Sequence, residues 1–207
     1  MKDAVNEIRK LAEKGVLAEN SAAAFRKDGV CYVTVRNADL KNLTETDLIV
    51  VRDDSDVSPD VMPKEYFLYL AIFEIFPKVS AIIRTSTESI RTASIVNRKV
   101  RPMLDDMAQI VGVSVRSVDE DVFENAQKIV KATSAMKDRT ALLIQNNGAV
   151  CVGATFDDAE VSAVVFEKAC KTVIESSFLG GGRYINPIEC WLMHLVYKLK
   201  YSKQAKK

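Results

Sequence analysis

The chain has 207 residues, of which 48 % are apolar, and this suits one domain or at most two small ones with a full hydrophobic core. Its charges nearly cancel to +1, so the net charge gives no reason to expect nucleic acid as a partner. No apolar run approaches the ~18 residues of a membrane span, and the charged start MKDAVNEIRKLAEKG lacks a signal-peptide core. We therefore expect a cytoplasmic protein that binds neither nucleic acid nor a membrane.

Neither the cysteines nor the last residues of the sequence indicate a catalytic or binding site. Cys31, Cys151, Cys170 and Cys190 are widely spaced and form no Cys-x-x-Cys pair, which is typical of reduced core residues in the cytoplasm. The sequence closes with the basic stretch KLKYSKQAKK. We interpret residues 199–207 as a solvated basic tail that follows a single domain over residues 1–198.

Several helices and strands are predicted in the first half of the chain. Helical spacing of apolar residues predicts a first helix over 5–12, and a second short helix is predicted over Glu19 to Phe25. A turn followed by a strand is predicted over DGVCYVTVR. In LTETDLIVVR, a Thr-x-x-Asp start signal precedes a predicted strand over 48–51. Prolines then bracket a predicted helix from about Lys64 to Phe76.

The second half alternates strands with helices. Strands are predicted over SAIIRTS and VSVRSV, and helices over ESIRTASIVNRKV and VFENAQKIVKATS. The stretch RPMLDDMAQIVG is predicted to be a helix or a loop with one turn. The stretch ALLIQNNGAVCVGATFDDAEVSAVVFEKA predicts a hairpin with its turn at Asn146-Asn147-Gly148, followed by a long helix. NPIECWLMHLVYKLKY predicts a closing amphipathic helix. The hairpin makes the sheet at least partly antiparallel, which favours a helix-flanked α/β sandwich over a doubly wound parallel sheet.

This order of elements resembles the class II aldolase and adducin-head family over almost the whole chain, and within it the fuculose-1-phosphate and rhamnulose-1-phosphate aldolases. KEYFLYLAIFEIFPKVSAIIRTS resembles the family's Ser-Ser-Glu helix and the strand that ends in His-Thr-His. LLIQNNGAVCVGATFDDA resembles its Leu-Leu-x-Asn-His-Gly-Val hairpin, and GGGRYINPIE its closing segment. The resemblance implies a three-layer α/β/α domain with a mixed, largely antiparallel central sheet.

The resemblance also implies where a metal would bind. The family holds zinc with three histidines, two from the strand's His-x-His and one from the Asn-His-Gly turn, and the matching positions here are Arg84, Ser86 and Asn147. A further family histidine is matched by Tyr69. Arginine stays protonated and cannot ligate a cation, and the other two side chains are weak zinc ligands. The sole histidine, His194, is expected to pack in the last helix, so we expect neither zinc nor another cofactor.

The positions that match the family's phosphate-binding loops differ as well. Arg26 is the one residue retained from the family's Gly-Asn-x-Ser-x-Arg stretch. In two further loops, Arg36 and Lys64 stand where the family has small residues. Asp105 and Asp106 fall near the position of the family's catalytic tyrosine. Together with Tyr69, the predicted pocket residues are Arg26, Arg36, Lys64, Asp105 and Asp106.

One catalytic position of the family is retained. Glu65 matches the family's acid/base glutamate, and a desolvated carboxylate there could shuttle a proton. Alternatively, Glu65 is a first-turn carboxylate that favours the helix dipole. Arg84 could occupy the metal position and pair with Glu65, or it could be a strand-end arginine that reaches solvent.

Three functional interpretations follow. The first is an aldolase-fold protein that serves as a non-catalytic binding or assembly subunit. The second is a metal-independent enzyme that acts on an anionic sugar-like substrate with Glu65 and Arg84, and it is favoured if Arg26, Arg36, Lys64 and Arg84 converge on one cleft. The third is a sugar-phosphate aldolase, a lyase, whose metal ligands lie at other positions. The resemblance further implies a homo-oligomer, commonly a four-fold tetramer.

Overall fold

A single seven-stranded sheet forms the centre of the molecule. The computed structural model describes residues 1–18, 21–51 and 57–204. Its strands are ordered β3-β2-β1-β4-β7-β6-β5. All neighbours pair antiparallel except β5 and β6, which are parallel, so the predicted mixed and largely antiparallel sheet is confirmed. The strands are β1 (Ala22–Lys27), β2 (Val30–Thr34), β3 (Leu48–Val51), β4 (Ala81–Thr85), β5 (Ser117–Val118), β6 (Ala141–Ile144) and β7 (Gly148–Gly153).

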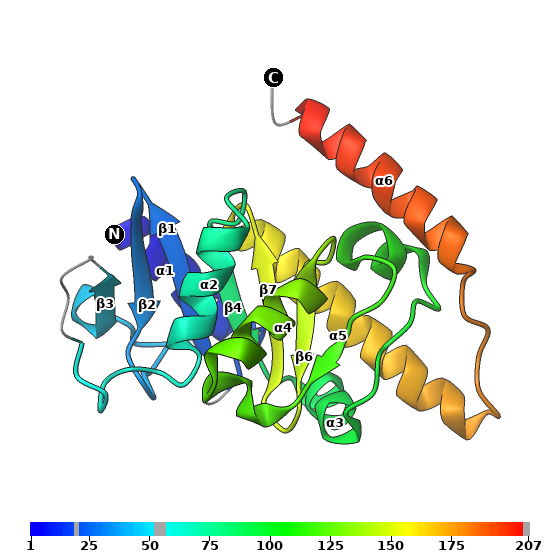
Figure 1. Ribbon diagram of the computed structural model, residues 1–207, viewed down its shortest axis with the longest axis horizontal. Coiled ribbons are helices and arrows are strands. Elements are labelled where there is room, and N and C mark those ends of the chain that lie inside the picture. Colours follow the sequence, from blue (N-terminus) through cyan, green and yellow to red (C-terminus); the bar gives the residue numbers. More distant parts are fainter. Residues whose placement is uncertain (19–20, 52–56, 205–207) are drawn as a thin grey trace.

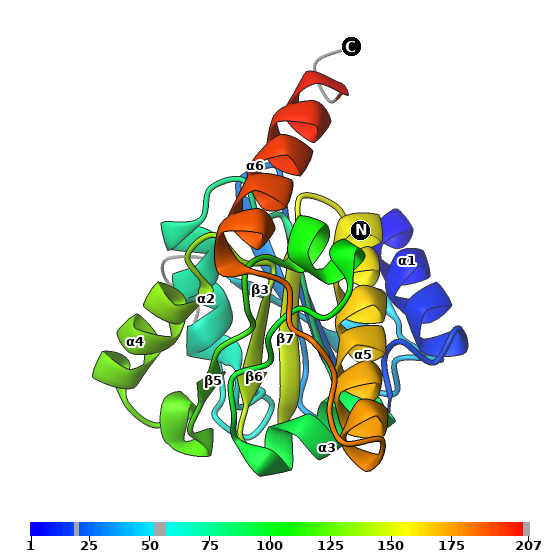
Figure 2. The same cartoon turned by 90° about the vertical axis from the view of Figure 1, so that its right-hand side faces the viewer.

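Helices cover both faces of this sheet, as Figures 1 and 2 show. Neighbouring residues of β4 face opposite layers: Ile83 packs with α1, α3 and α5, whereas Ile82 packs with α2 and α4. The predicted three-layer α/β/α arrangement is therefore confirmed. The helices are α1 (Lys2–Glu13), α2 (Tyr66–Ile75), α3 (Glu88–Val96), α4 (Ala126–Met136), α5 (Phe156–Phe178) and α6 (Pro187–Gln204).

One predicted helix is wrong. Helix was expected over residues 19–25, but Ala22–Lys27 forms strand β1, between β2 and β4; residues 19 and 20 lie outside the described residues. Ala23 and Ala24 are both fully buried, each in a different layer. An alanine run has high helix propensity, but these small side chains also fit a strand that is covered on both faces, and tertiary packing decides.

The last helix extends away from the body (Figures 1 and 2). It contacts the body through η2, a π-helical turn over Met107–Val111 in the segment predicted as a helix or one turn. His194 Nδ1 lies 2.7 Å from the carbonyl oxygen of Gln109, and the histidine is buried there, as expected of a packed residue. Within the described ranges, no helix has the length and apolar character needed to cross a bilayer.

Candidate functional site

A cleft of about 880 Å³ opens at the end of the sheet where β4 and β6 finish. Four segments and the first turns of α3 surround it: the approach to β1, the loop after β2, the approach to α2, and the turn between β6 and β7. Its polar lining residues are Ser21, Arg36, Asn37, Lys64, Glu65, Arg84, Ser86, Arg91, Asn146 and Asn147.

The turn between β6 and β7 lies against the end of β4 because of one glycine. Gly148 has φ +77°, and a Cβ there would lie 2.2 Å from the carbonyl oxygen of Thr85. Only glycine allows this close approach at a positive φ. The turn places Asn147 beside Arg84, whose Nη1 donates to the carbonyl oxygen of Asn147 at 3.3 Å. The hairpin predicted from the Asn-Asn-Gly sequence is thus a structural part of the cleft.

An ion pair lies at the centre of the cleft. Arg84 Nε is 2.6 Å from Glu65 Oε1, so the predicted pairing is present. The contact is a close ion pair rather than a well-aligned hydrogen bond. Glu65 lies at the amino end of α2, and only 3 % of its surface is exposed. A charge this deep needs its partner, because an unpaired buried carboxylate is strongly destabilising.

Two buried hydroxyl groups near this pair have no hydrogen-bond partner among the described residues, those of Ser21 and Tyr69. Tyr69 is completely buried, and its pKa is raised well above the usual value, first by burial and then by the charge of Glu65, with Arg84 opposing. The tyrosine is therefore neutral and lies beneath the ion pair rather than on the cleft wall.

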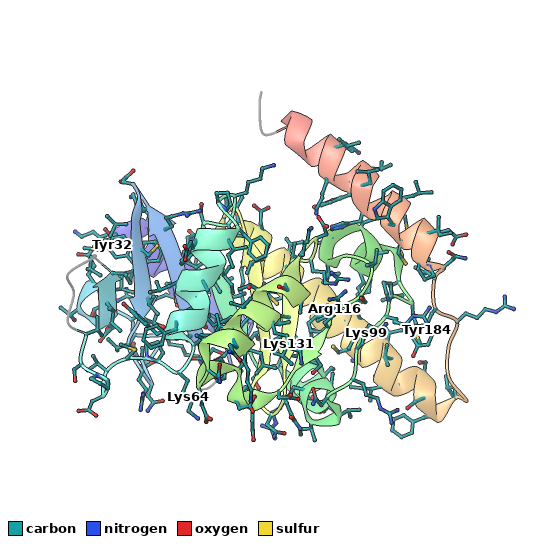
Figure 3. All side chains as sticks on the ribbon, in the orientation of Figure 1. Tyr32, Lys64, Lys99, Arg116, Lys131 and Tyr184 are labelled. Atoms are coloured by element: carbon teal, nitrogen blue, oxygen red, sulfur yellow. The ribbon has the colours of Figure 1, made fainter. Side chains whose placement is uncertain are left out.

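Three further cations surround the ion pair. Arg36 is fixed in place, because its Nε donates to the carbonyl oxygen of Met62 at 2.9 Å and Nη2 to that of Pro59 at 3.2 Å. Lys64 and Arg91 are exposed at the cleft (Figure 3 labels Lys64). Glu65 is the one acidic side chain among the described lining residues, so the cleft has an excess of positive charge.

The sequence did not indicate Arg91, nor the residue that holds its helix. Glu167 of α5 accepts hydrogen bonds from the Thr87 hydroxyl at 2.6 Å and from the backbone N–H groups of Ser89 and Ile90 at 3.0 and 2.9 Å. Free N–H groups at a helix start need such an acceptor. Glu167 thereby fixes the start of α3, which carries Arg91. No sequence spacing connects residues 167 and 91, and the fold alone brings them together.

Three of the predicted pocket residues lie elsewhere. Arg26 is at the other end of β1, where its guanidinium donates to the carbonyl oxygens of Phe73, Pro77 and Val79. The prediction for Arg26 does not hold because it lies four positions further along an extended strand than Ala22, which does line the cleft.

Neither predicted aspartate lines the cleft either. Asp106 accepts a hydrogen bond from the N–H of Met107 at the start of η2 and pairs with Lys168 at 2.8 Å. Asp105 precedes it in the same segment. The family resemblance assigns these aspartates to the pocket, and the structure instead places Asp106 at the start of η2, where it caps that turn.

The comparisons with known proteins agree with this architecture. The profile of the family described as Class II Aldolase and Adducin N-terminal domain matches residues 7–174. An L-fuculose phosphate aldolase from Methanocaldococcus jannaschii is 24 % identical over 167 residues, which are 80 % of this chain and 91 % of that protein.

Solved structures are similar at lower identity. A structure of an L-fuculose 1-phosphate aldolase has a TM-score of 0.84 and 18 % identity, and the match covers 95 % of each chain. The L-fuculose-1-phosphate aldolase from Thermus thermophilus has a TM-score of 0.71 and 15 % identity, over 87 % of this chain and 95 % of that one. At these identities the likeness shows the fold.

Proposed function

The chain belongs to the family of class II aldolase and adducin N-terminal domains, and from this premise we propose that it binds a small anionic ligand without zinc chemistry. In this proposal it is a non-catalytic binding or assembly subunit. The observation that carries the proposal is the ion pair of Arg84 with Glu65, which puts a permanent cation at a position that the family resemblance assigns to a metal ligand.

The residues at the three assigned metal positions do not fit zinc. Arg84, Ser86 and Asn147 all line the cleft, so the fold does bring these positions together. A guanidinium has no lone pair to donate and repels a cation, while zinc prefers imidazole, thiolate and carboxylate ligands. The side-chain amide of Asn147 already donates to the carbonyl oxygen of Gln145 at 2.9 Å. No step of the proposed function passes through a metal.

The charges of the cleft favour an anion. The carboxylate of Glu65 is balanced by Arg84 at 2.6 Å, which leaves Arg36, Lys64 and Arg91 without an acidic partner in the lining. Arginine forks match phosphate and carboxylate groups, and lysine contributes a point charge. Ser21, whose buried hydroxyl lacks a partner among the described residues, adds a hydrogen-bonding group to the wall. A small phosphate or carboxylate with hydroxyl groups has the chemistry to satisfy this set.

Calorimetric titration of metal-stripped protein with inorganic phosphate and fuculose 1-phosphate tests the proposal. We expect saturable binding that weakens at least about tenfold in Lys64→Ala and in Arg91→Ala, because each loses a charge-assisted contact worth ~1.5–3 kcal/mol. Lys131→Ala, on the exposed side of α4, is the matched control and leaves binding unchanged. Binding that appears only after zinc is added contradicts the proposal.

A second candidate is a metal-independent enzyme, and the depth of Glu65 favours it. The convergence of Arg36, Lys64 and Arg84 on one cleft supports this candidate too, although Arg26 is not part of the group. A desolvated carboxylate can serve as a general base. Glu65→Gln would then abolish turnover of the bound anion and retain its binding. Unchanged turnover in this variant removes the candidate.

We also propose that the chain forms a homo-oligomer, a tetramer in the arrangement that the family resemblance implies. Support comes from α6, where Ile188, Val196 and Leu199 are each more than half exposed. Exposed apolar stripes of this kind mark protein contacts. Light scattering of the purified chain measures its mass, and a monomer at micromolar concentration contradicts this part of the proposal.

A further inference from the structure

A second polar cavity, of about 490 Å³, lies at the end of the sheet where β6 begins, whereas the cleft lies where β6 finishes. The end of α4, the approach to β5 and one side of α6 enclose it. Its charged lining residues are Arg116, Lys137, Asp138, Arg139 and Lys198. The one acid among them, Asp138, pairs with Lys198 at 3.2 Å, so the remaining cations have no carboxylate in the described lining.

Two arginines, Arg116 and Arg139, line this cavity close enough for their charges to repel. Arg139 is fixed by backbone carbonyls: its Nε donates to Ser114 at 2.7 Å and its Nη1 to Lys137 at 2.6 Å. Burial, and then the charge of the exposed Arg116, lower the pKa of the Arg139 guanidinium, and Asp138 only partly opposes this. Guanidinium groups can bind phosphate oxygens through paired N–H donors.

Two aromatic side chains of α6 also line the cavity. Trp191 of α6 lines it with 55 % of its surface exposed, and it is the only tryptophan of the chain. Next to it, His194 is 5 % exposed, and its Nε2 has no hydrogen-bond partner among the described residues. Burial lowers the pKa of His194, so it adds no charge. An indole face beside a cationic group suits a planar ring that carries a phosphate.

We propose that this cavity binds a nucleotide, with its phosphate on Arg116 and Arg139 and its base stacked on Trp191. The volume lies within the ~300–1,000 Å³ of small-ligand sites. Arg116 and the cleft residue Lys64 lie well apart in Figure 3, so the two sites can be tested separately. The proposal does not depend on the function proposed for the cleft, because the two cavities share no lining residue among those described.

Fluorescence of Trp191 tests the proposal directly, because no other tryptophan contributes. Adenosine monophosphate is added to the full chain, with excitation at the red edge of the indole band, where adenine does not absorb. We expect a saturable change, and about tenfold weaker binding of ribose 5-phosphate, which has the phosphate but no base to stack. No saturable change, or equal affinity for the two compounds, overturns the proposal.

Substitutions test whether Arg116 contacts the phosphate of adenosine monophosphate. Arg116→Ala is expected to weaken adenosine monophosphate binding at least tenfold, and Arg116→Lys by less, since lysine retains the charge without the fork. Lys131→Ala removes one charge from an exposed position of α4 outside the cavity lining, labelled in Figure 3, and Arg91→Ala removes one from the cleft. Neither variant changes the affinity that Trp191 fluorescence measures. Thermal unfolding verifies that Arg116→Ala is folded. An affinity equal to that of Lys131→Ala overturns the proposal.

Discussion

The two polar cavities lie at opposite ends of β6, and they differ in how the charge of their arginines is balanced. In the cleft, the buried Arg84 has a carboxylate 2.6 Å away, so the charge is balanced within the protein. In the cavity beside α6, Arg139 donates to the backbone carbonyls of Ser114 and Lys137, and the repulsion from Arg116 outweighs the attraction of Asp138. The first arrangement is part of the folded structure, whereas at the second we propose that the phosphate of a bound nucleotide balances the charge of Arg116. Substitutions should therefore affect stability at one end and affinity at the other.

The largest effect is expected from Arg84→Met. This change leaves Glu65 buried without its cation, and breaking such a pair costs about 3–5 kcal/mol of unfolding free energy. Urea denaturation measures the loss. Arg116→Ala is the contrasting variant and should change the unfolding free energy by less than about 0.5 kcal/mol, as exposed positions do.

The double variant Arg84→Met with Glu65→Gln separates charge from packing. It removes both charges and should be more stable than Arg84→Met alone, because no carboxylate remains buried without a partner. If the single and double variants unfold alike, the two ends of the sheet do not differ in the way described.

Gly148→Ala should have the next largest effect. A side chain at φ +77° is strained by about 1–3 kcal/mol, and its Cβ would also meet the Thr85 carbonyl oxygen at 2.2 Å. The turn must then move away from β4, so anion binding in the cleft weakens along with stability. Calorimetry of the variant measures both. Gly180→Ala, also at a positive φ but with no atom within 4 Å, is the matched control and should leave cleft binding unchanged.

The contribution of Glu167 to the free energy of unfolding should depend on pH. Burial opposes its ionisation, but the hydrogen bonds from Thr87, Ser89 and Ile90 outweigh burial, and the pKa is lowered. Its contribution is therefore present above the ordinary pKa of a glutamate and is lost as the pH falls through the lower folded value. Glu167→Gln should flatten the fall of stability in acid, which unfolding curves between neutral and acid pH measure. An unchanged slope contradicts this role.

The smallest effect is expected at the second cavity from Asp138→Asn. Asparagine tolerates the positive φ of 59° at this position, so the fold is retained. Removing the only acid of the described lining should tighten nucleotide binding by about two- to threefold, an effect the size of a weak surface charge interaction. Trp191 fluorescence measures it. Weaker binding would show that the aspartate, rather than the arginines, contacts the ligand.

The sequence predicted the parts of the fold and of the site that local patterns specify. The Asn-Asn-Gly turn, the proline-bounded helix α2 and the facing positions of Glu65 and Arg84 follow from spacing and family resemblance. The strand β1 was mistaken for a helix because both of its faces are buried, which removes the polar alternation. Arg91 was missed because only the packing of α3 brings it to the cleft.

We propose that in the cleft the fixed cation of Arg84 takes the place of a zinc ion. The most direct measurement is the zinc content of untagged protein purified with zinc present, by elemental mass spectrometry against protein concentration. The ion pair of Arg84 with Glu65 predicts far less than one equivalent per chain. Close to one equivalent would contradict the account, because ligands other than Arg84, Ser86 and Asn147 would then hold the metal and the aldolase interpretation would apply.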